Sequence, residues 1–376
     1  MAVGNVDFPE MKVVSGIKLG TSNAGIKQTE RDDILVVEMA EGASCAGVFT
    51  QNAFCAAPVH VAKDHLQQSP RWLLINSGNA NAGTGEQGML DTNTCCASLA
   101  SVVNGDQKQV LPFSTGVIGE NLPVDKVETA LPKAVAALQE DNWQQAAHAI
   151  MTTDTFAKGA SIVIEIDGHP ITLTGISKGA GMIQPNMATM LGFVATDAKI
   201  SQSLLQKCLS AAAEQSFNRI TVDGDTSTND ACILMASGCS SAAEITENSE
   251  SYALFSQAVM AICKRLAELI VRDGEGATKL MRISVEQAAN NEEAVLVGKT
   301  IAHSPLVKTA FFASDPNWGR ILAAVGRSGI EQMDLDKVEI YLDEVCIVKN
   351  GGRAESYTEE QGQQVMNKKE ILIRVV

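Results

Sequence analysis

The chain has few aromatic residues, a shortage of basic residues relative to acidic ones, and no long apolar run. Only 4% of its 376 residues are aromatic while 45% are hydrophobic, so any core must be built mainly from aliphatic side chains. The formal net charge is −15, whereas a nucleic-acid-binding protein needs a basic surface. The same charge argues against binding to an anionic membrane surface. No stretch has signal length or approaches the ~18 apolar residues of a membrane span. We therefore expect a cytoplasmic protein that binds neither nucleic acid nor membrane.

Cysteine is present without the spacing that metal binding requires. The nine cysteines include no C-x-x-C pair, their number is odd, and most stand among small or apolar residues. We therefore expect neither a disulfide framework nor a structural metal, and a reducing compartment. The acidic run TVDGDTSTND, Thr221 to Asp230, departs from the calcium-loop pattern, so its Ser and Thr residues favour a hydrogen-bonded turn over a metal site.

The most informative stretch is SKGAGMIQPNMATMLGF, Ser177 to Phe193, at the middle of the chain. Gly179 and Pro185 suit a loop, and apolar residues follow Thr189. The Thr189 hydroxyl is a weak nucleophile unless a base lies beside it. Cleavage of the peptide between Ala188 and Thr189 would free an α-amine, whose pKa of ~8 suits a general base. A threonine that follows a glycine-rich loop is nevertheless more often an N-cap or a packed core residue. A phosphate-binding loop is a further alternative, but the stretch lacks the spacing of that motif.

Two strand-to-glycine junctions precede this stretch. A strand predicted at 71–75 leads into NSGNANAGTG, Asn76 to Gly85, which suits a site loop or a tight Asn-bonded turn equally well. A strand predicted at 109–113 leads into STGVIGE. There the Thr115 hydroxyl and the Gly116 N–H could meet the oxyanion formed when a hydroxyl attacks an amide. A turn before a helix is the simpler interpretation of these residues.

Four motifs together strongly resemble the ornithine acetyltransferase family of arginine biosynthesis. They are KGAGMIQPNMATMLGF, NSGNANAGTG, TVDGDTSTND and DPNWGRI (Asp315 to Ile321), and the resemblance covers essentially the whole chain in order. It implies an α/β fold, a layered sandwich with mixed sheets between helices, with the chemistry of N-terminal-nucleophile hydrolases. It also implies self-cleavage into residues 1–188 and 189–376, two chains that share one core and associate as a heterotetramer or larger oligomer.

The resemblance also assigns roles to individual residues. It implies that Thr189 is the nucleophile, that Thr115 and Gly116 form the oxyanion hole, and that the substrate contacts are Thr152 (with Thr153 as the alternative), Lys178, Thr189 and Glu275. From the residues alone, Thr152 would be a capping hydroxyl, Lys178 a surface lysine and Glu275 an exposed turn residue.

The implied reaction is ping-pong. Thr189 takes the acetyl group from N2-acetylornithine and passes it to glutamate, giving ornithine and N-acetylglutamate. No metal or organic cofactor is needed, because exchange of an amide for an amine through an ester is nearly balanced in energy. Some members of the family also use acetyl-CoA as the donor.

Two other functions suit the same sequence. A self-cleaving amidase or aminopeptidase would use water in place of glutamate. An inactive homologue is the second, because members of the family usually continue beyond the point that corresponds to Val376, and that extension supplies an Asn and a Thr or Ser to the substrate site. The residues predicted for self-cleavage all lie upstream of this point.

Hydrophobic periodicity predicts alternating strands and helices along the chain. Strands are predicted at 33–40, 42–52, 71–75, 109–113, 219–221, 280–286 and 370–376. One hairpin is predicted at 161–175, with its turn at Asp167-Gly168, and another is formed by 337–348 and the turn at 350–352. Helices are predicted at 91–103, 122–139, 143–151, 202–215, 251–271 and 292–303, and a helix or loop at 359–367. The inner stripe of the longest helix is predicted to be Leu254, Ala258, Ile262, Leu266 and Ile270.

Overall fold

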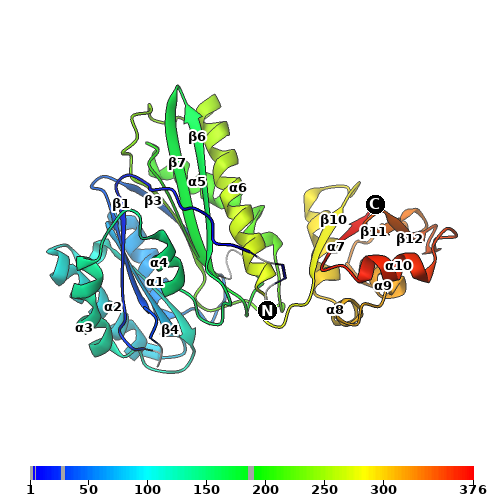
Figure 1. Cartoon of the computed structure of the whole chain (residues 1–376), viewed down its shortest axis with the longest axis horizontal. Coiled ribbons are helices and arrows are strands. Elements are labelled where there is room, and N and C mark those ends of the chain that lie inside the picture. The colour runs from blue at the N-terminus through cyan, green and yellow to red at the C-terminus, as the bar shows by residue number, and fades with distance from the viewer. Residues whose placement is uncertain (1–2, 5, 27–29, 185–189) are drawn as a thin grey trace. The chain divides into compact units, whose positions relative to one another are not determined.

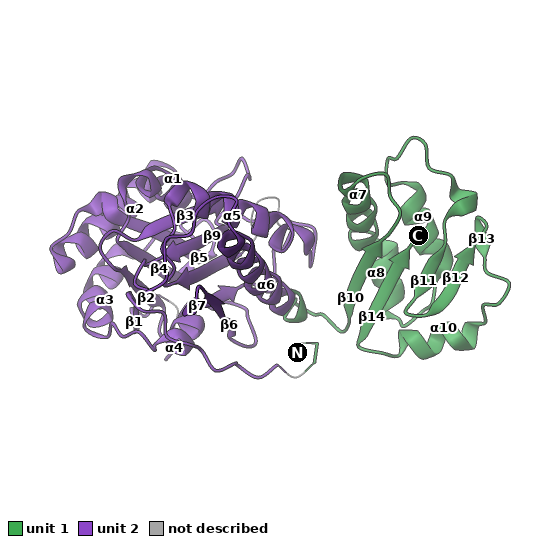
Figure 2. Cartoon of the chain, turned by 90° about the horizontal axis from the view of Figure 1, so that it is seen from above, with its two compact units in different colours: residues 1–5, 271–376 green, residues 6–270 purple. Residues whose placement is uncertain are grey.

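The computed structural model describes residues 3–4, 6–26, 30–184 and 190–376, and the chain divides into two compact units. The larger unit spans residues 6–270, and the smaller unit comprises residues 1–5 and 271–376 (Figure 2). Ala188 and Thr189 lie outside the described residues. The division into chains 1–188 and 189–376 therefore stays a prediction.

The strands of the larger unit form two mixed sheets. They are β1 Ile17–Ser22, β2 Ile34–Met39, β3 Ser44–Phe49, β4 Trp72–Asn79, β5 Val110–Val117, β6 Lys158–Ile166, β7 His169–Lys178, β8 Leu191–Thr196 and β9 Ala231–Ala236. The first sheet has the order β1-β2-β4-β5 and the second the order β3-β9-β8-β7-β6. The pairs β4–β5 and β8–β9 are parallel, and the other neighbours are antiparallel.

Helices pack against both sheets of the larger unit. They are α1 Ala57–His65, α2 Gly85–Val103, α3 Val124–Ala136, α4 Trp143–Ala149, α5 Gln202–Glu214 and α6 Glu250–Arg272. One apolar cluster joins α2 and α3 to the first sheet, and another joins α5 and α6 to the second (Figure 1). Between the sheets, Phe113 of β5 meets Phe193 of β8 edge to face, with ring centroids 5.2 Å apart. The predicted layered sandwich with mixed sheets between helices is confirmed.

The central strands are buried on both faces. On β4, Leu73 and Ile75 belong to the cluster between the sheets, whereas Trp72 and Leu74 belong to the cluster beneath α2 and α3. A strand covered on both faces reads as a continuous apolar run rather than an alternating one. Strand β9, ACILMA, is buried along its whole length, so its sequence shows no alternation and it was not predicted.

The strand predicted at 219–221 is wrong. Phe217–Arg219 forms a short 3₁₀ turn. Beyond it, the Thr221 hydroxyl and the Val222 N–H both donate to the Ile183 carbonyl, at 3.0 and 2.7 Å. The segment therefore pairs with the loop that follows β7 instead of joining a sheet. In α6, Leu254 is 38% exposed and Phe255 is buried in its place, whereas the other four residues of the predicted stripe are buried.

The other strands and helices predicted for the larger unit are confirmed, although their ends differ from the predicted ones. Helix α2 begins six residues before the predicted 91–103, and β5 continues four residues past the predicted 109–113. The predicted hairpin turn is confirmed, with positive φ angles of 51° at Asp167 and 78° at Gly168.

The smaller unit has one mixed sheet of order β10-β14-β11-β12-β13. Its elements are β10 Leu280–Val285, α7 Asn291–Ala302, α8 Pro305–Phe312, α9 Trp318–Gly326, β11 Ile340–Leu342, β12 Val345–Lys349, β13 Gly352–Arg353, α10 Glu359–Met366 and β14 Glu370–Val375. The hairpin predicted from 337–348 and the turn at 350–352 is confirmed, because β12 and β13 pair as antiparallel strands around that turn. The stretch 337–348 itself contains a second hairpin, formed by β11 and β12. It turns at Asp343, where φ is 49° and the carboxylate accepts the Leu372 N–H at 2.9 Å.

The DPNWGRI motif has a structural role in the smaller unit. The Asn317 side chain caps α9 by accepting the Arg320 N–H at 3.1 Å, and Trp318 packs against the core. No helix within the described ranges is long and apolar enough to cross a lipid bilayer.

Candidate active site

Lys178 and Thr115, which belong to different sheets, meet in the larger unit. Lys178 is the last residue of β7, and Thr115 lies near the end of β5. Lys178 Nζ donates to Thr115 Oγ1 across 3.1 Å, and the two residues are only 9% and 8% exposed. Because a threonine oxygen that accepts one bond can still donate its own hydrogen, this contact leaves the Thr115 hydroxyl able to donate to a ligand. The structure thus brings together two of the predicted site residues.

Gly116 lies where the parallel strands β4 and β5 come close together. Its register partner is Gly78, and its φ of 137° is a value that favours glycine. A Cβ placed on Gly116 would lie 2.3 Å from the backbone carbonyl carbon of Gly78. No other residue fits there without moving a strand. The interpretation of this junction as a turn before a helix is therefore wrong, since β5 continues through Thr115 and Gly116 to Val117.

Buried amide side chains hold Ser114, the residue before Thr115, in place. Ser114 Oγ donates to Asn76 Oδ1 at 2.6 Å, which ties β5 to the NSGNANAGTG segment. From the TVDGDTSTND segment, Asn229 Nδ2 donates to the carbonyls of Ala80 and Ser114 at 2.5 and 2.9 Å. Three of the motifs identified in the sequence, counting STG, therefore converge on one strand end.

Ser77 connects the same strand end to the Thr152 segment. Ser77 is a register partner of Thr115, and its Oγ donates to the carbonyl of Ala149 at 2.7 Å. Ala149 is the last residue of α4, three positions before Thr152. A hydrogen bond from β4 therefore fixes the backbone three residues before Thr152, the predicted substrate contact.

Asp154 joins the Thr152 segment to the Lys178 segment. Its Oδ2 accepts the Thr152 N–H at 2.9 Å, and its Oδ1 accepts the Gly179 N–H at 2.7 Å and pairs with Lys158 Nζ at 2.6 Å. The side chains of Asp154 and Lys158 are fully buried. Burial by itself would raise the pKa of Asp154. The charges of Lys178 and Lys158 and the hydrogen bonds from Lys158 and Gly179 outweigh it, so the pKa is held well below its usual range.

Asp230 is a second buried carboxyl group near Lys178. It is 4% exposed, and its Oδ2 has no hydrogen-bond partner in the part of the chain that the structure describes. Burial raises the pKa of Asp230 well above its usual range, although hydrogen bonds from Ser227 and the charge of Lys178 act in the opposite direction. The next residue, Ala231, donates its N–H to the Met190 carbonyl at 2.9 Å. Asp230 therefore adjoins the chain just after residues 185–189, which are not described.

The other acidic residues of TVDGDTSTND bear out the hydrogen-bonded turn. The Asp223 carboxylate accepts the N–H groups of Met182, Ile183 and Asp225 at 2.7, 3.0 and 3.0 Å. These bonds hold the loop after β7 against the 221–230 segment.

The predicted residues do not all fall within this cluster. Ala188 and Thr189 lie outside the described residues, and Glu275 is an exposed turn residue of the smaller unit, between α6 and β10. Asp154 and Lys158 were not predicted as site residues, and Asp230 was considered only as part of the acidic run 221–230. The first two stand four apart in TTDTFAK, a spacing that signals a pair only when burial is known.

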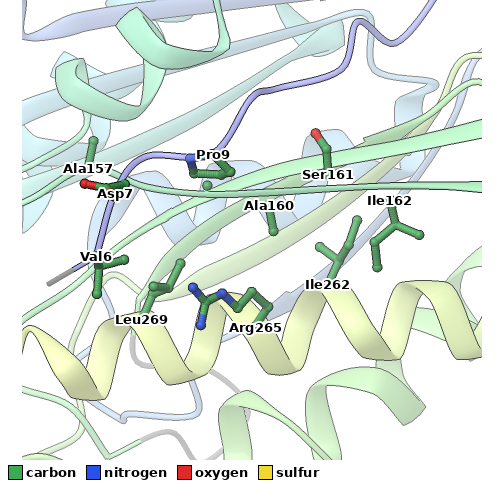
Figure 3. A pocket seen from close by; sticks show the side chains of 11 residues that line it. Val6, Asp7, Pro9, Ala157, Ala160, Ser161, Ile162, Ile262, Arg265 and Leu269 are labelled. Carbon is green, nitrogen blue, oxygen red and sulfur yellow. The ribbon is translucent and has the colours of Figure 1, made fainter. Parts of the chain in front are cut away.

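A separate cavity of about 190 Å³ lies in the larger unit between residues 6–9, β6 and α6 (Figure 3). Its polar lining includes Asp7, Ser161 and Arg265 and none of the predicted site residues. Arg265 also pairs with Glu268 at 3.7 Å on its own helix. The cavity is therefore distinct from the cluster around Lys178.

The sequence profile of the ArgJ family matches residues 18–376. The arginine biosynthesis bifunctional protein ArgJ of Methylococcus capsulatus is 63% identical over 362 residues, which are 96% of this chain and 89% of that protein. Its namesake from Pseudomonas fluorescens is 55% identical over 376 residues, 100% of this chain and 93% of that protein. A crystal structure of ornithine acetyltransferase from Mycobacterium tuberculosis, complexed with ornithine, is similar at 30% identity. It covers 48% of this chain and 98% of its own, with a TM-score of 0.42.

Proposed function

Because this chain belongs to the ArgJ family and is therefore an acetyltransferase of arginine biosynthesis, we propose that it transfers the acetyl group of N2-acetylornithine to glutamate. The products are ornithine and N-acetylglutamate. The observation that carries the proposal is the buried contact between Lys178 Nζ and Thr115 Oγ1 at 3.1 Å. It joins a cation suited to a substrate carboxylate to a hydroxyl suited to an oxyanion.

The precursor first cleaves its own peptide between Ala188 and Thr189, which frees the α-amine of Thr189. Strands β7 and β8, which stand before and after this bond in the sequence, are antiparallel neighbours in one sheet. This pairing supports the proposal that chains 1–188 and 189–376 remain together as one αβ unit. We propose that such units associate into a heterotetramer or larger oligomer.

In the first half-reaction, Thr189 Oγ attacks the acetyl carbonyl of N2-acetylornithine while the α-amine of Thr189 accepts the hydroxyl proton. The Thr115 hydroxyl and the Gly116 N–H donate to the oxyanion. The C–N bond then breaks, the proton passes from the α-amine to the leaving nitrogen, and ornithine departs from an acetyl-threonine ester. In the second half-reaction, the amino group of glutamate attacks this ester, N-acetylglutamate leaves, and the Thr189 hydroxyl is restored.

Substrate recognition follows from the charges of the proposed contacts. Lys178 and Thr152 bind the α-carboxylate that ornithine and glutamate share, and Glu275 binds the side-chain ammonium of ornithine through a charge-assisted hydrogen bond. The exchange uses no metal or organic cofactor, and acetyl-CoA is a second acetyl donor to glutamate. We place the enzyme in the cytoplasm, which suits its nine free cysteines.

The test is a denaturing gel with N-terminal sequencing, combined with a product assay. Wild type should give two bands, with the second starting at Thr189, and should form N-acetylglutamate from N2-acetylornithine and glutamate. The Thr189→Ala variant should give one band near 39.8 kDa and no product. A wild type that stays uncut while fully active would exclude the mechanism. Release of acetate without N-acetylglutamate would identify an amidase instead.

A further inference from the structure

The buried ion pair of Asp154 and Lys158 is the feature of the larger unit that the proposed chemistry does not use. Its side chains are fully buried at a separation of 2.6 Å, and the Lys158 ammonium also lies 4.8 Å from the centre of the Phe156 ring. Taking two charges out of water costs several kcal/mol for each ion, and such pairs often add nothing to stability. A pair buried this deeply beside the proposed site therefore calls for a role other than stability.

We propose that Asp154, held in place by Lys158, is a positioning residue for the α-carboxylate site that donor and acceptor share. The proposal rests on the proposed function for the identity of these substrates. Asp154 touches no reacting atom in it, and acts by fixing the two chain segments that present Thr152 and Lys178.

The hydrogen bonds of Asp154 support this role. Its two oxygens bind two different segments of the chain. Oδ2 accepts the Thr152 N–H at 2.9 Å, and Oδ1 accepts the Gly179 N–H at 2.7 Å. Gly179 directly follows Lys178 and has a φ of 153°. One carboxylate thus sets the spacing between the two proposed carboxylate-binding residues.

Charge makes these bonds strong. Since the neighbouring ammonium groups of Lys178 and Lys158 outweigh the effect of burial and lower the pKa of Asp154, the carboxylate is ionised at neutral pH. Hydrogen bonds to an ionised acceptor are roughly twice as strong as those between neutral groups. A neutral amide at this position would keep the shape of the side chain and lose most of the restraint.

The two substrates give the proposal a distinctive consequence. N2-acetylornithine and glutamate share the α-carboxylate beside the reacting nitrogen, and they differ at the far end of the side chain. A residue that positions the α-carboxylate site must therefore affect both substrates alike. A residue that binds the far end must affect only one of them.

The experiment compares Asp154→Asn with Glu275→Gln in protein shown by gel to be fully self-cleaved. Asp154→Asn should lower kcat/KM for N2-acetylornithine and for glutamate by a similar factor of about 10²-fold, the loss that a misplacement of ~1 Å can cause. Most of this loss should come from a higher KM for each substrate, with a smaller loss in kcat. Glu275→Gln should raise the KM of N2-acetylornithine and leave that of glutamate nearly unchanged. A loss confined to kcat after Asp154→Asn, or to one substrate, would overturn the proposal.

A double variant separates positioning from folding. Asp154→Asn alone removes the carboxylate that pairs with the buried Lys158 charge, which is strongly destabilising. Asp154→Asn combined with Lys158→Met removes that charge, so its melting temperature should recover while both KM values stay high. If both KM values recover with the melting temperature, Asp154 is only an ion-pair partner and the proposal is wrong.

Calorimetric binding of ornithine and of glutamate gives a readout that does not require turnover. Asp154→Asn should weaken both by a similar factor. If wild type binds both amino acids and transfers no acetyl group, the proposed function fails while the positioning role is still measured. If wild type binds neither, both proposals are excluded.

Discussion

The two units of the chain bury their polar groups in opposite ways. In the larger unit, charged and amide side chains such as Asp154, Lys158 and Asn229 are almost completely buried. Among the described residues of the smaller unit, the buried polar ones are only Asp273, Ser304 and Ser328. Lys337 and Asp334 form an ion pair there whose side chains are 83% and 52% exposed. Because buried charge is costly, its concentration in one unit marks where the structure serves chemistry rather than stability.

The largest expected effect is at the Thr115 hydroxyl. Thr115→Val keeps the side-chain shape and removes the proposed oxyanion donor, so kcat should fall by about 10²–10³-fold. The matched control is Thr300→Val on α7 of the smaller unit, where the hydroxyl donates only to the Leu296 carbonyl at 2.7 Å. Steady-state acetyl transfer should be unchanged there. Equal losses in the two variants would remove the contrast between the units.

The next effect compares two asparagines. Asn229→Ala leaves the buried carbonyls of Ala80 and Ser114 without their donor, which should cost about 3 kcal/mol of unfolding free energy. Asn317→Ala removes the N-cap of α9 and should cost about 1 kcal/mol. Urea unfolding, monitored separately in each unit by hydrogen exchange, measures the loss of unfolding free energy in both variants. A cost at Asn229 no larger than at Asn317 would mean that this amide is dispensable.

The smallest expected effect is on the pH dependence of stability, which should differ between wild type and Asp230→Asn. Because burial raises the pKa of Asp230, the folded protein holds this proton more tightly than the unfolded chain, and stability should fall as pH rises from the ordinary value of about 3.9 through the raised pKa. Asp230→Asn has no such proton. The melting-temperature advantage of the variant over wild type should therefore grow with pH across this window.

An exposed carboxylate of the smaller unit gives the opposite slope. A hydrogen bond from Lys337 lowers the pKa of Asp334, so its contribution is present above the ordinary pKa and is lost as pH falls through the lowered one. Asp334→Asn should therefore lose a little stability relative to wild type at neutral pH and less in acid. A pH-independent difference for Asp230→Asn would show that folding does not raise the pKa of the Asp230 carboxyl.

Local patterns in the sequence predict the layers and most elements of this fold. The Asp167-Gly168 hairpin and most of the helices were identifiable because turn residues and periodicity are local signals. The short helices α1, α8 and α9 were not predicted, since eight or nine residues show too little periodicity. Strand β9 was not, because burial on both faces removes alternation, and the 217–230 segment binds the loop after β7 rather than a sheet.

The candidate site was predictable only where a motif carried it. Thr115 and Lys178 stood in recognisable segments, and the structure joins them. Asp154 and Lys158 were missed since nothing local distinguishes a buried pair from a solvated one at the same spacing. Gly78 and Gly116 became a required pair only when strands β4 and β5 were placed side by side.

The edge-to-face contact of Phe113 with Phe193 has a consequence for any attempt to engineer this protein. The two rings lie between the sheets, and the Lys178–Thr115 hydrogen bond spans the same gap, from β7 to β5. The volume of these rings therefore helps to set the distance between the two strands that carry the proposed site residues. We expect hydrostatic pressure or a smaller core side chain to change the Lys178–Thr115 distance, so a change to this core would also change the proposed site.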